Sequence, residues 1–379
     1  MTAVQDPVRM DAAERLACLR LIRTENVGPI AYRELLARFG SAGRALEALP
    51  GLARRGGRPG LRICPRADAE RELEALTRLG GRIVVAGEPE YPAALAVLND
   101  SPPLIAVAGD VDLVRRRGVA VVGARNASAN GRRFAEDLAR QLGAAGLVVV
   151  SGLARGIDAA AHRGALDSGT VAVLAGGLDV VYPPEHAELQ RAIAARGALV
   201  AEQPLGTVPQ ARHFPRRNRV ISGLALGVVV VEAAERSGSL ITARLALEQG
   251  RQVMAVPGSP LDPRCRGANR LIRDDGAVLV QSAADVIESL EGSILPGPGE
   301  RARGTATGAE APLFAPEEAP ADARALVESR LGASPVAVDE LVRQCQLSSA
   351  VVQTVLLELE LAGRLERHPG NRISLILGG

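Results

Sequence analysis

Short runs of β-branched and other apolar residues recur from about position 82, and each is followed by a glycine-containing loop and a helical pattern. Strands that are apolar at nearly every position and alternate with helices are typical of a mostly parallel sheet covered on both faces. The pattern therefore predicts an α/β fold, with a doubly wound Rossmann-like core over residues 81–291. The predicted strands are Ile83–Val85, Val119–Val122, Leu147–Val150, Val171–Leu174, Leu199–Val200, Val228–Val231, Val253–Val256 and Val278–Val280.

The segment before this core, residues 1–80, has helical periodicity. Apolar residues recur at helical spacing behind a candidate cap, Asp11, and a turn at residues 26–29 leads into a second helix that ends at Gly40. This arrangement resembles a helix-hairpin-helix or SAM-like unit. Such a hairpin can hold a phosphate on backbone N–H groups at a helix start, or it can serve only as a packing module.

The segments after the core differ sharply from each other. Residues 292–320 are rich in Gly, Pro, Ala and charge, which predicts a linker. Residues 321–379 follow the order helix, helix, helix, hairpin, which predicts a winged-helix domain. Its third helix carries Glu358 and Glu360 and no basic residue, whereas a helix that enters the major groove needs positive charge. We therefore expect this domain to contact protein rather than duplex DNA.

The amino-acid composition limits the kinds of binding site that the chain can form. Net charge is +2, and none of the 45 basic residues is Lys, so any phosphate contact is made by a planar guanidinium that can also stack on bases. The four cysteines are widely spaced, which argues against a metal site or a disulfide framework. No apolar run is long enough to cross a bilayer and no signal peptide is visible, so we expect a cytoplasmic protein with no membrane association.

The loops after the predicted strands carry the candidate binding residues, because ligands of open α/β sheets bind beyond the carboxyl ends of the strands. Arg125, Arg155, Ser237 and Ser239 each lie a few residues after a predicted strand, among glycines. Because these strands are expected to be parallel, their following loops meet at one edge of the sheet. Small residues, hydroxyls and arginines gathered there suit a row of phosphates.

Residues 212–219 form the densest basic segment of the chain, with four arginines, no acidic residue and one of only four phenylalanines. Backbone neutralisation beside an aromatic ring is how proteins hold single strands without reading the bases. A charge run is often only a solvated surface. This one interrupts the parallel sheet on its ligand-binding side, so we predict a basic-aromatic loop that binds a flexible polyanion. Its candidates are Arg212, Phe214, Arg216, Arg217, Asn218 and Arg219.

Five motifs, taken in order, resemble the DprA/Smf family of bacterial DNA-processing proteins, and the flanking domains match its three-part layout. The resemblance implies single-stranded DNA binding, protection of incoming DNA in natural transformation, loading of the RecA recombinase, and a homodimer through the Rossmann-like domain. It implies no cofactor, no metal and no covalent reaction. The winged helix would then touch RecA or a second protomer. The motifs are GARNAS, SGLARGIDAAAH, FPRRNRVISGLA, VVVEAAERSGSLITARLALEQGR and AVPGSPLDPRCRGANRLIRDDGA.

By position, the same resemblance implies a set of DNA-binding residues. Relatives often place Lys in this pocket, so which arginine fills each role here stays open. The set is Arg125, Arg212, Phe214, Arg217, Asn218, Arg219, Ser237 and Ser239. Arg155 and Arg216 join the candidates because the roles of Arg155, Arg212 and Arg216 stay open.

An enzymatic alternative stays open beside the binding one. Glu232 and Glu235 lie close together beyond a strand end, and phosphoribohydrolases of nucleoside monophosphates resemble this chain in their phosphate loops. Their P-G-G-x-G-T-x-x-E loop is replaced here by AGGLD at residues 175–179, without the Thr and Glu. Dinucleotide and P-loop sites are excluded, because the first helix lacks G-x-G-x-x-G and the chain lacks Lys. Asp158 and His162 lie four residues apart on one predicted helix. Such a pair is more often a side-chain contact within the helix than a metal site or a proton relay.

Overall fold

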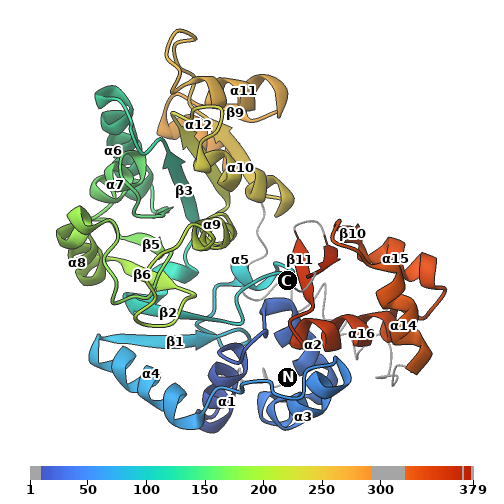
Figure 1. Ribbon diagram of the computed structural model, residues 1–379. Coiled ribbons are helices and arrows are strands. Elements are labelled where there is room, and N and C mark those ends of the chain that lie inside the picture. The colour runs from blue at the N-terminus through green and yellow to red at the C-terminus, as the bar shows by residue number, and fades with distance from the viewer. Residues whose placement is uncertain (1–9, 292–320, 369–370, 377–379) are drawn as a thin grey trace, which may run out of the picture. The chain divides into compact units, whose positions relative to one another are not determined.

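The structure is a computed structural model that describes residues 10–291, 321–368 and 371–376 (Figure 1). These residues form two compact units. The larger unit begins at Arg71 and includes the whole Rossmann-like core, whereas the smaller combines Met10–Glu70 with the C-terminal residues. The segment predicted as a linker, 292–320, lies outside the described residues.

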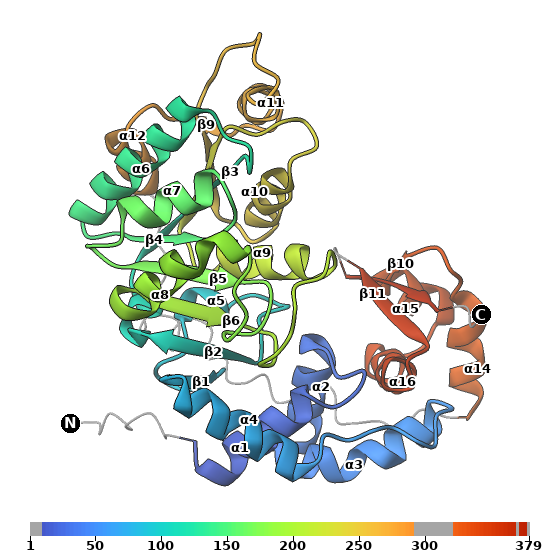
Figure 2. The ribbon, with the colours of Figure 1, turned by 60° about the vertical axis from the view of Figure 1, so that its left-hand side comes forward.

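The larger unit is built on a nine-stranded sheet in the order β1-β2-β6-β5-β4-β3-β7-β8-β9 (Figure 2). The strands from β6 to β9 in that order are parallel, and β1 and β2 extend the β6 edge in antiparallel fashion. The strands are β1 (Gly81–Val85), β2 (Leu104–Gly109), β3 (Gly118–Gly123), β4 (Val148–Ser151), β5 (Thr170–Leu174), β6 (Ala198–Ala201), β7 (Gly227–Val231), β8 (Gln252–Ala255) and β9 (Val278–Leu279).

The order of the strands confirms the doubly wound fold. The chain lays down β3, β4, β5 and β6 in one direction, then returns to the other side of β3 to add β7, β8 and β9. The direction therefore reverses between β3 and β7. Open α/β sheets bind their ligands at such a reversal, outside the carboxyl ends of the strands.

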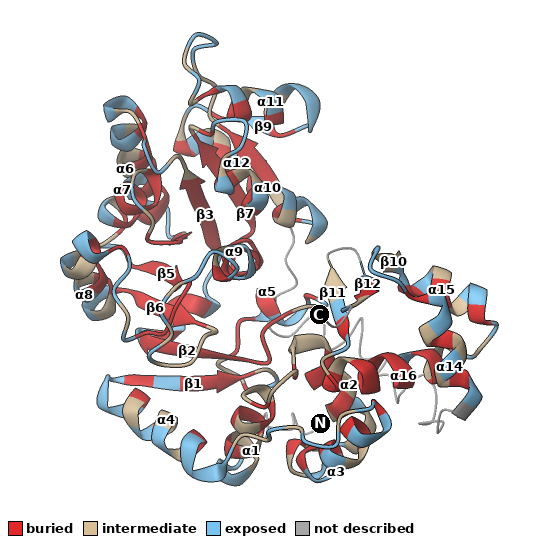
Figure 3. Cartoon of the chain, in the orientation of Figure 1, coloured by how far each residue is buried: buried red, intermediate tan, exposed pale blue. Residues whose placement is uncertain are grey.

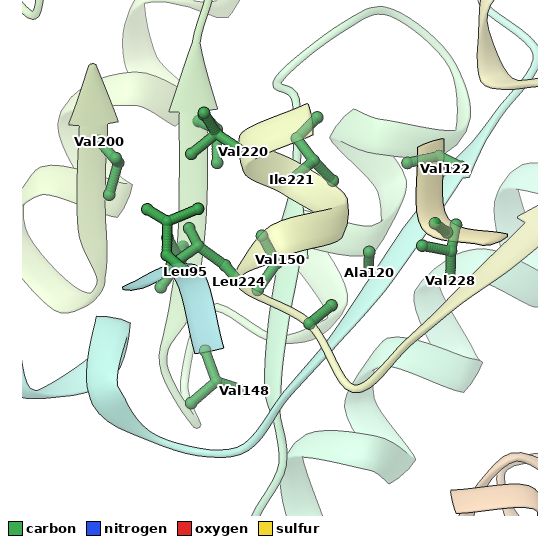
Figure 4. Packing of buried hydrophobic residues seen from close by; sticks show 14 of the residues in the cluster. Leu95, Ala120, Val122, Val148, Val150, Val200, Val220, Ile221, Leu224 and Val228 are labelled. Atoms are coloured by element: carbon green, nitrogen blue, oxygen red, sulfur yellow. The ribbon is translucent and has the colours of Figure 1, made fainter. Parts of the chain in front are cut away.

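Helices cover both faces of this sheet, as a parallel sheet requires. Figure 4 shows Val220 and Ile221 of α9, and Leu224 just after it, packed with strand residues such as Val150, so the apolar side of this helix is anchored in the core. One face carries α6 (Ala129–Ala144), α7 (Ile157–Gly164) and α12 (Ala283–Glu291); the other carries α5 (Ala93–Ala96), α9 (His213–Gly223), α10 (Gly238–Glu248) and α11 (Arg266–Asp274). In addition, α8 (Ala187–Arg196) packs against β2, β5 and β6.

Two features of the larger unit differ from the sequence-based prediction. The basic-aromatic segment was predicted as a loop, and this is wrong, because residues 213–219 form the first two turns of α9. A helix turns its side chains to different sides, so Arg217 and Arg219 are buried while Arg216 is exposed. Strand β2 was not predicted. It follows two prolines and contains Ala and Gly, which weaken the strand signal.

The smaller unit contains the helical N-terminal module and a winged helix. Asp11 caps α1 as predicted, because its carboxylate accepts a hydrogen bond of 2.6 Å from the Glu14 N–H. The winged-helix prediction is confirmed, with one additional strand, β10. The elements are α1 (Ala12–Ile22), α2 (Pro29–Phe39), α3 (Ala42–Arg55), α14 (Ala321–Arg330), β10 (Val336–Ala337), α15 (Val338–Cys345), α16 (Ser349–Leu361), β11 (Leu365–His368) and β12 (Arg372–Leu375), and α4 (Arg66–Arg78) runs across the boundary of the two units.

Candidate nucleic-acid interface

A pocket of about 380 Å³ lies at the carboxyl ends of β3, β4 and β5, beside the reversal point of the sheet. The loops that follow these three strands supply most of its wall, and α9 and the segment between β6 and α9 supply the rest. The lining residues are Arg125, Asn126, Gly152, Leu153, Ala154, Arg155, Leu174, Ala175, Gly176, Val180, Tyr182, Pro183, Pro184, Pro209, Phe214 and Arg217.

The half-buried ring of Phe214 forms part of the wall of this pocket. The Cζ atom of Arg125 lies 5.1 Å from the centroid of the Phe214 ring, and that of Arg217 lies 6.0 Å from it. The ring of Tyr182 is tilted against Phe214, with 5.7 Å between the ring centroids. Aromatic faces beside guanidinium groups can stack on a base and neutralise the neighbouring phosphate.

Arg217 is a buried cation held by neutral partners. Its Nη1 donates to the carbonyl oxygens of Gly152 and Val173, the latter at 2.6 Å, and its Nε donates to Oδ1 of Asn218 at 3.2 Å. Burial lowers the pKa of Arg217 to about 10, so the side chain stays charged at neutral pH. A Cβ at Gly152 would collide with this guanidinium, which explains why the loop needs glycine at that position.

Arg125 and Arg155 come from neighbouring loops, and only Arg155 forms an ion pair among the described residues. Gly156, with φ +75°, lies against the backbone carbonyls of Ala124 and Arg125, so the loops after β3 and β4 meet closely. Arg155 is exposed and paired with Glu185, which raises its pKa. Within the described ranges, neither Arg125 nor Arg217 has a carboxylate within ion-pair distance. The charge of Arg125 is therefore left for an anion, whereas the charge of the buried Arg217 is partly offset by nearby Asp158.

The loop between β4 and α7 and the N-terminus of α6 are each already occupied by a carboxylate of the chain. Asp158 at the start of α7 accepts hydrogen bonds from the N–H groups of Gly152 (3.1 Å) and Ala154 (3.4 Å). Burial raises the pKa of Asp158, and the nearby charge of Arg217 opposes this shift. Glu232, at φ 52°, accepts hydrogen bonds from the N–H and hydroxyl of Ser128, the cap of α6. Anion binding in the pocket therefore depends on guanidinium groups.

The residues of the enzymatic alternative do not line this pocket. Glu232 is engaged at α6, and Glu235 is exposed to solvent. His162 is fully buried, and its Nδ1 bonds to the Thr170 hydroxyl at 2.9 Å. Burial first, and then the charge of Arg217, lower the pKa of His162 to about 3, so the imidazole is neutral at pH 7. No group of three metal-ligating side chains occurs among the described residues.

The structure brings together four of the proposed binding residues and places the others elsewhere. Arg125, Arg155, Phe214 and Arg217 line the pocket. Asn218 does not line it, but its side chain accepts a hydrogen bond from Arg217. Sequence reasoning missed Tyr182 as a site residue, although it is one of only three tyrosines and follows a predicted strand.

Five further candidates lie outside the pocket lining. Arg219 is buried and donates to Glu202 at 2.5 Å and to the carbonyl of Asp100. The hydroxyls of Ser237 and Ser239 bond to each other at 2.7 Å, and Ser237 caps α10. Arg212 and Arg216 are exposed.

Comparison with known proteins shows the family of this chain. Residues 82–291 match the family described as DNA recombination-mediator protein A. Residues 12–75 match the DprA-like N-terminal HHH domain, and residues 309–371 match the DprA winged helix domain. The chain belongs to the DprA family. No helix within the described ranges is long and apolar enough to cross a membrane.

Individual relatives agree with this assignment. Protein Smf of Escherichia coli is 38% identical over 316 residues, which is 82% of each chain. DNA processing protein DprA of Bacillus subtilis is 42% identical over 223 residues, 58% of this chain and 75% of the relative.

Two solved structures are similar to this one. The DprA of Streptococcus pneumoniae superposes with a TM-score of 0.59 at 34% identity, covering 74% of this chain and 98% of that one. The DprA of Helicobacter pylori, described by its single-stranded DNA binding mode, gives a TM-score of 0.52 at 27% identity, covering 56% of this chain and 97% of that one.

Proposed function

We propose that this chain binds single-stranded DNA through the pocket around Phe214 and does no covalent chemistry on it. The observation that carries the proposal is the Phe214 ring in the pocket wall, with the Cζ atoms of Arg125 and Arg217 at 5.1 and 6.0 Å from its centroid. Neither arginine forms an ion pair among the described residues. The Helicobacter pylori relative, whose structure is described by its binding of single-stranded DNA, gives independent support.

Stacking on Phe214 and Tyr182 explains a preference for single strands. Bases in a duplex are paired and stacked on one another, so their faces are not available to a side chain. An unpaired base has two free faces and can enter a pocket whose wall is aromatic and prolyl. Its phosphates would contact Arg125 and Arg217, with Arg155 at the edge of the pocket.

Finer parts of the proposal rest on the family resemblance. We infer that the chain protects incoming DNA in natural transformation, loads the RecA recombinase onto it and acts as a homodimer through the Rossmann-like domain in the cytoplasm. RecA filament assembly on an oligonucleotide covered by single-strand-binding protein, followed with and without this chain, tests the loading. Light scattering of the purified chain tests the dimer.

Titration of labelled oligo-dT tests the binding site. Wild type should bind oligo-dT more tightly than a duplex of equal length, and Arg125→Ala should weaken this binding on the order of tenfold. Arg191→Ala on α8 removes an equal charge from an exposed position outside the pocket and should leave binding unchanged. Equal loss in both variants would mean that general charge, and not this pocket, holds the strand. Turnover of a nucleoside monophosphate, measured in parallel, would favour the enzymatic alternative.

A further inference from the structure

Helix α16 of the winged helix is apolar around nearly its whole circumference. Val351, Val355, Leu357 and Leu361 belong to a set of nine buried residues among its thirteen positions. Figure 3 shows α16 buried along most of its length. A helix that is hydrophobic on all sides must pack against two neighbours rather than one. One neighbour is the core of the winged helix, and the other is formed by α2 and α3 of the N-terminal module.

Glu358 is the main polar contact of α16 with the N-terminal module. Its carboxylate is 2% exposed and accepts a hydrogen bond of 2.6 Å from Nε of Arg55, at the end of α3. Arg324 of α14 donates to the other carboxylate oxygen. A buried carboxylate is tolerated only when it is paired in this way, so the contact between α3 and α16 needs both arginines.

A second ionic cluster joins α2 to the end of α16. Arg367 of β11 donates to Glu360 at 2.7 Å and to Glu34 of α2 at 3.2 Å. The side-chain amide of Asn26 donates to the carbonyl of Leu361 at 3.1 Å. The Asn26 side chain therefore also partners the carbonyl of a residue in the last turn of α16.

These contacts cover the surfaces through which both modules would meet nucleic acid. In a winged helix, the helix in the position of α16 is the one that enters the major groove. In a helical hairpin, the start of the second helix is where a phosphate would bind. Here a Cβ at Gly28, the N-cap of α2, would lie only 3.6 Å from Oε1 of Glu360. A carboxylate thus lies where the hairpin would hold a phosphate.

We propose that α16 is an intramolecular acidic partner of the N-terminal helical module and occupies the surface that this module would present to a nucleic-acid backbone. The winged helix of this chain therefore does not read duplex DNA through α16. Charge supports the pairing, because α16 carries two glutamates and no basic residue, whereas α3 ends in Arg54 and Arg55. The inference is independent of the pocket around Phe214.

Gly56 offers a direct steric test of this pairing. It ends α3 with φ −66° and ψ −8°, so alanine adds no backbone strain there. Its new Cβ, however, would overlap the carbonyl oxygen of Glu358 and lie 2.9 Å from the Cβ of Ala362. Gly51→Ala, on the same helix, is the matched control. Apart from the neighbouring backbone of α3, the nearest atom to its new Cβ would be Nη1 of Arg55, at 3.8 Å.

The experiment uses the full chain with a specific protease site inserted between residues 299 and 320. After cleavage, the fragment that begins near residue 321 should stay bound to the rest of wild type and of Gly51→Ala during size-exclusion chromatography. Gly56→Ala should weaken this association at least tenfold, because backbone atoms of α16 must move to accept the methyl group. Release of the fragment from wild type, or equal retention by Gly56→Ala, would overturn the proposal.

A second pair of variants guards against a folding defect in Gly56→Ala. Arg55→Ala removes one partner of the buried Glu358 from a half-exposed position and should weaken retention several-fold. Arg54→Ala is its control, since the side chain of Arg54 is exposed and, among the described residues, bonds to the Pro50 carbonyl of its own helix rather than to α16. Circular dichroism of all four variants checks that the helices are intact. Equal retention by Arg55→Ala and Arg54→Ala would also count against the pairing.

Discussion

The pocket of the larger unit and the α16 contact of the smaller unit both gather arginines, but they differ in what neutralises them. Around α16, Arg55, Arg324 and Arg367 each meet a glutamate of the chain. Around Phe214, Arg217 donates to carbonyl groups, both Arg125 and Arg217 lie near the aromatic ring, and neither forms an ion pair among the described residues. The arginines around α16 are neutralised by glutamates and hold the fold together, whereas Arg125 in the pocket is left to attract an external anion and Arg217 serves both purposes.

The comparison matters because the count of charges alone does not distinguish the two regions. Each is rich in guanidinium groups, and each lies beside a helix of a domain type that binds nucleic acid. The partners of the arginines decide which region is available to a ligand. The variants below test this difference in order of expected effect.

Removing Arg217 should have the largest effect, because this arginine serves both fold and binding. Arg217→Ala removes a hydrogen-bond donor from the carbonyls of Gly152 and Val173 and removes a positive charge that lowers the pKa of the buried Asp158. We expect it to lower the free energy of unfolding by about 3 kcal/mol or more. Arg125→Ala, at an exposed position, should change that free energy by less than about 0.5 kcal/mol. Chemical denaturation measures both, and equal losses would remove the distinction between a structural and a free arginine.

Removing the ring of Phe214 should weaken oligo-dT binding by about 1–3 kcal/mol for each stacked base. Because the ring carries no charge, the slope of log K against log salt should not change. Arg125→Ala, in contrast, should make that slope shallower by about 0.7 for each lost phosphate contact. Titrations at two salt concentrations distinguish these outcomes. A changed slope in Phe214→Ala would mean that the ring acts by positioning the arginines rather than by stacking.

The α16 contact should weaken as pH rises from about 4.5 to 7. Burial, and then the charge of Glu360, raise the pKa of Glu34 to about 7, while Arg367 lowers it. The docked state therefore binds a proton that the separated state releases, and this stabilisation is lost as the pH rises through that window. The expected change is on the order of 1–3 kcal/mol.

Retention of the cleaved winged helix at several pH values measures the effect. Glu34→Gln should flatten the profile. The flattening should be partial, because burial also raises the pKa of Glu360. A Glu34→Gln profile identical to that of wild type would assign the pH dependence to other groups.

Ser237→Ala should have the smallest effect on binding. Ser237 caps α10 and bonds to Ser239, and neither residue lines the pocket. We expect a loss of about 1 kcal/mol in the free energy of unfolding and an unchanged affinity for oligo-dT. A large loss of affinity would extend the binding surface from the pocket to the start of α10.

The sheet could be predicted from the sequence because each strand is marked by its own short run of residues. Val119–Val122 and Val228–Val231 are apolar at every position, which is typical of a strand that is buried on both faces. The caps of α1 and α2, Asp11 and Gly40, are equally local signals. Strand β2 was missed because its weak β-propensity is offset only by pairing with β1 and β6.

The site was harder to predict, because burial of a charge depends on partners that are distant in the sequence. Arg217 reaches a carbonyl of β5, and Arg219 reaches Glu202, and no local pattern reveals either contact. The basic segment was therefore interpreted as a solvent-facing loop rather than as a helix with a buried side. The packing of α16 on a second neighbour could have been predicted, since VVQTVLLELEL is apolar on nearly every side of the helix. That pattern indicates two packing neighbours but not which ones.

Photo-crosslinking tests the central claim most directly. A single-stranded oligonucleotide containing 5-iododeoxyuridine is irradiated in complex with the chain, and the crosslinked peptide is identified by mass spectrometry. The account predicts crosslinks to Phe214 or Tyr182, which should be lost in a Phe214→Ala, Tyr182→Ala double variant. Crosslinks confined to the N-terminal module or to the winged helix would show that the strand does not bind in this pocket.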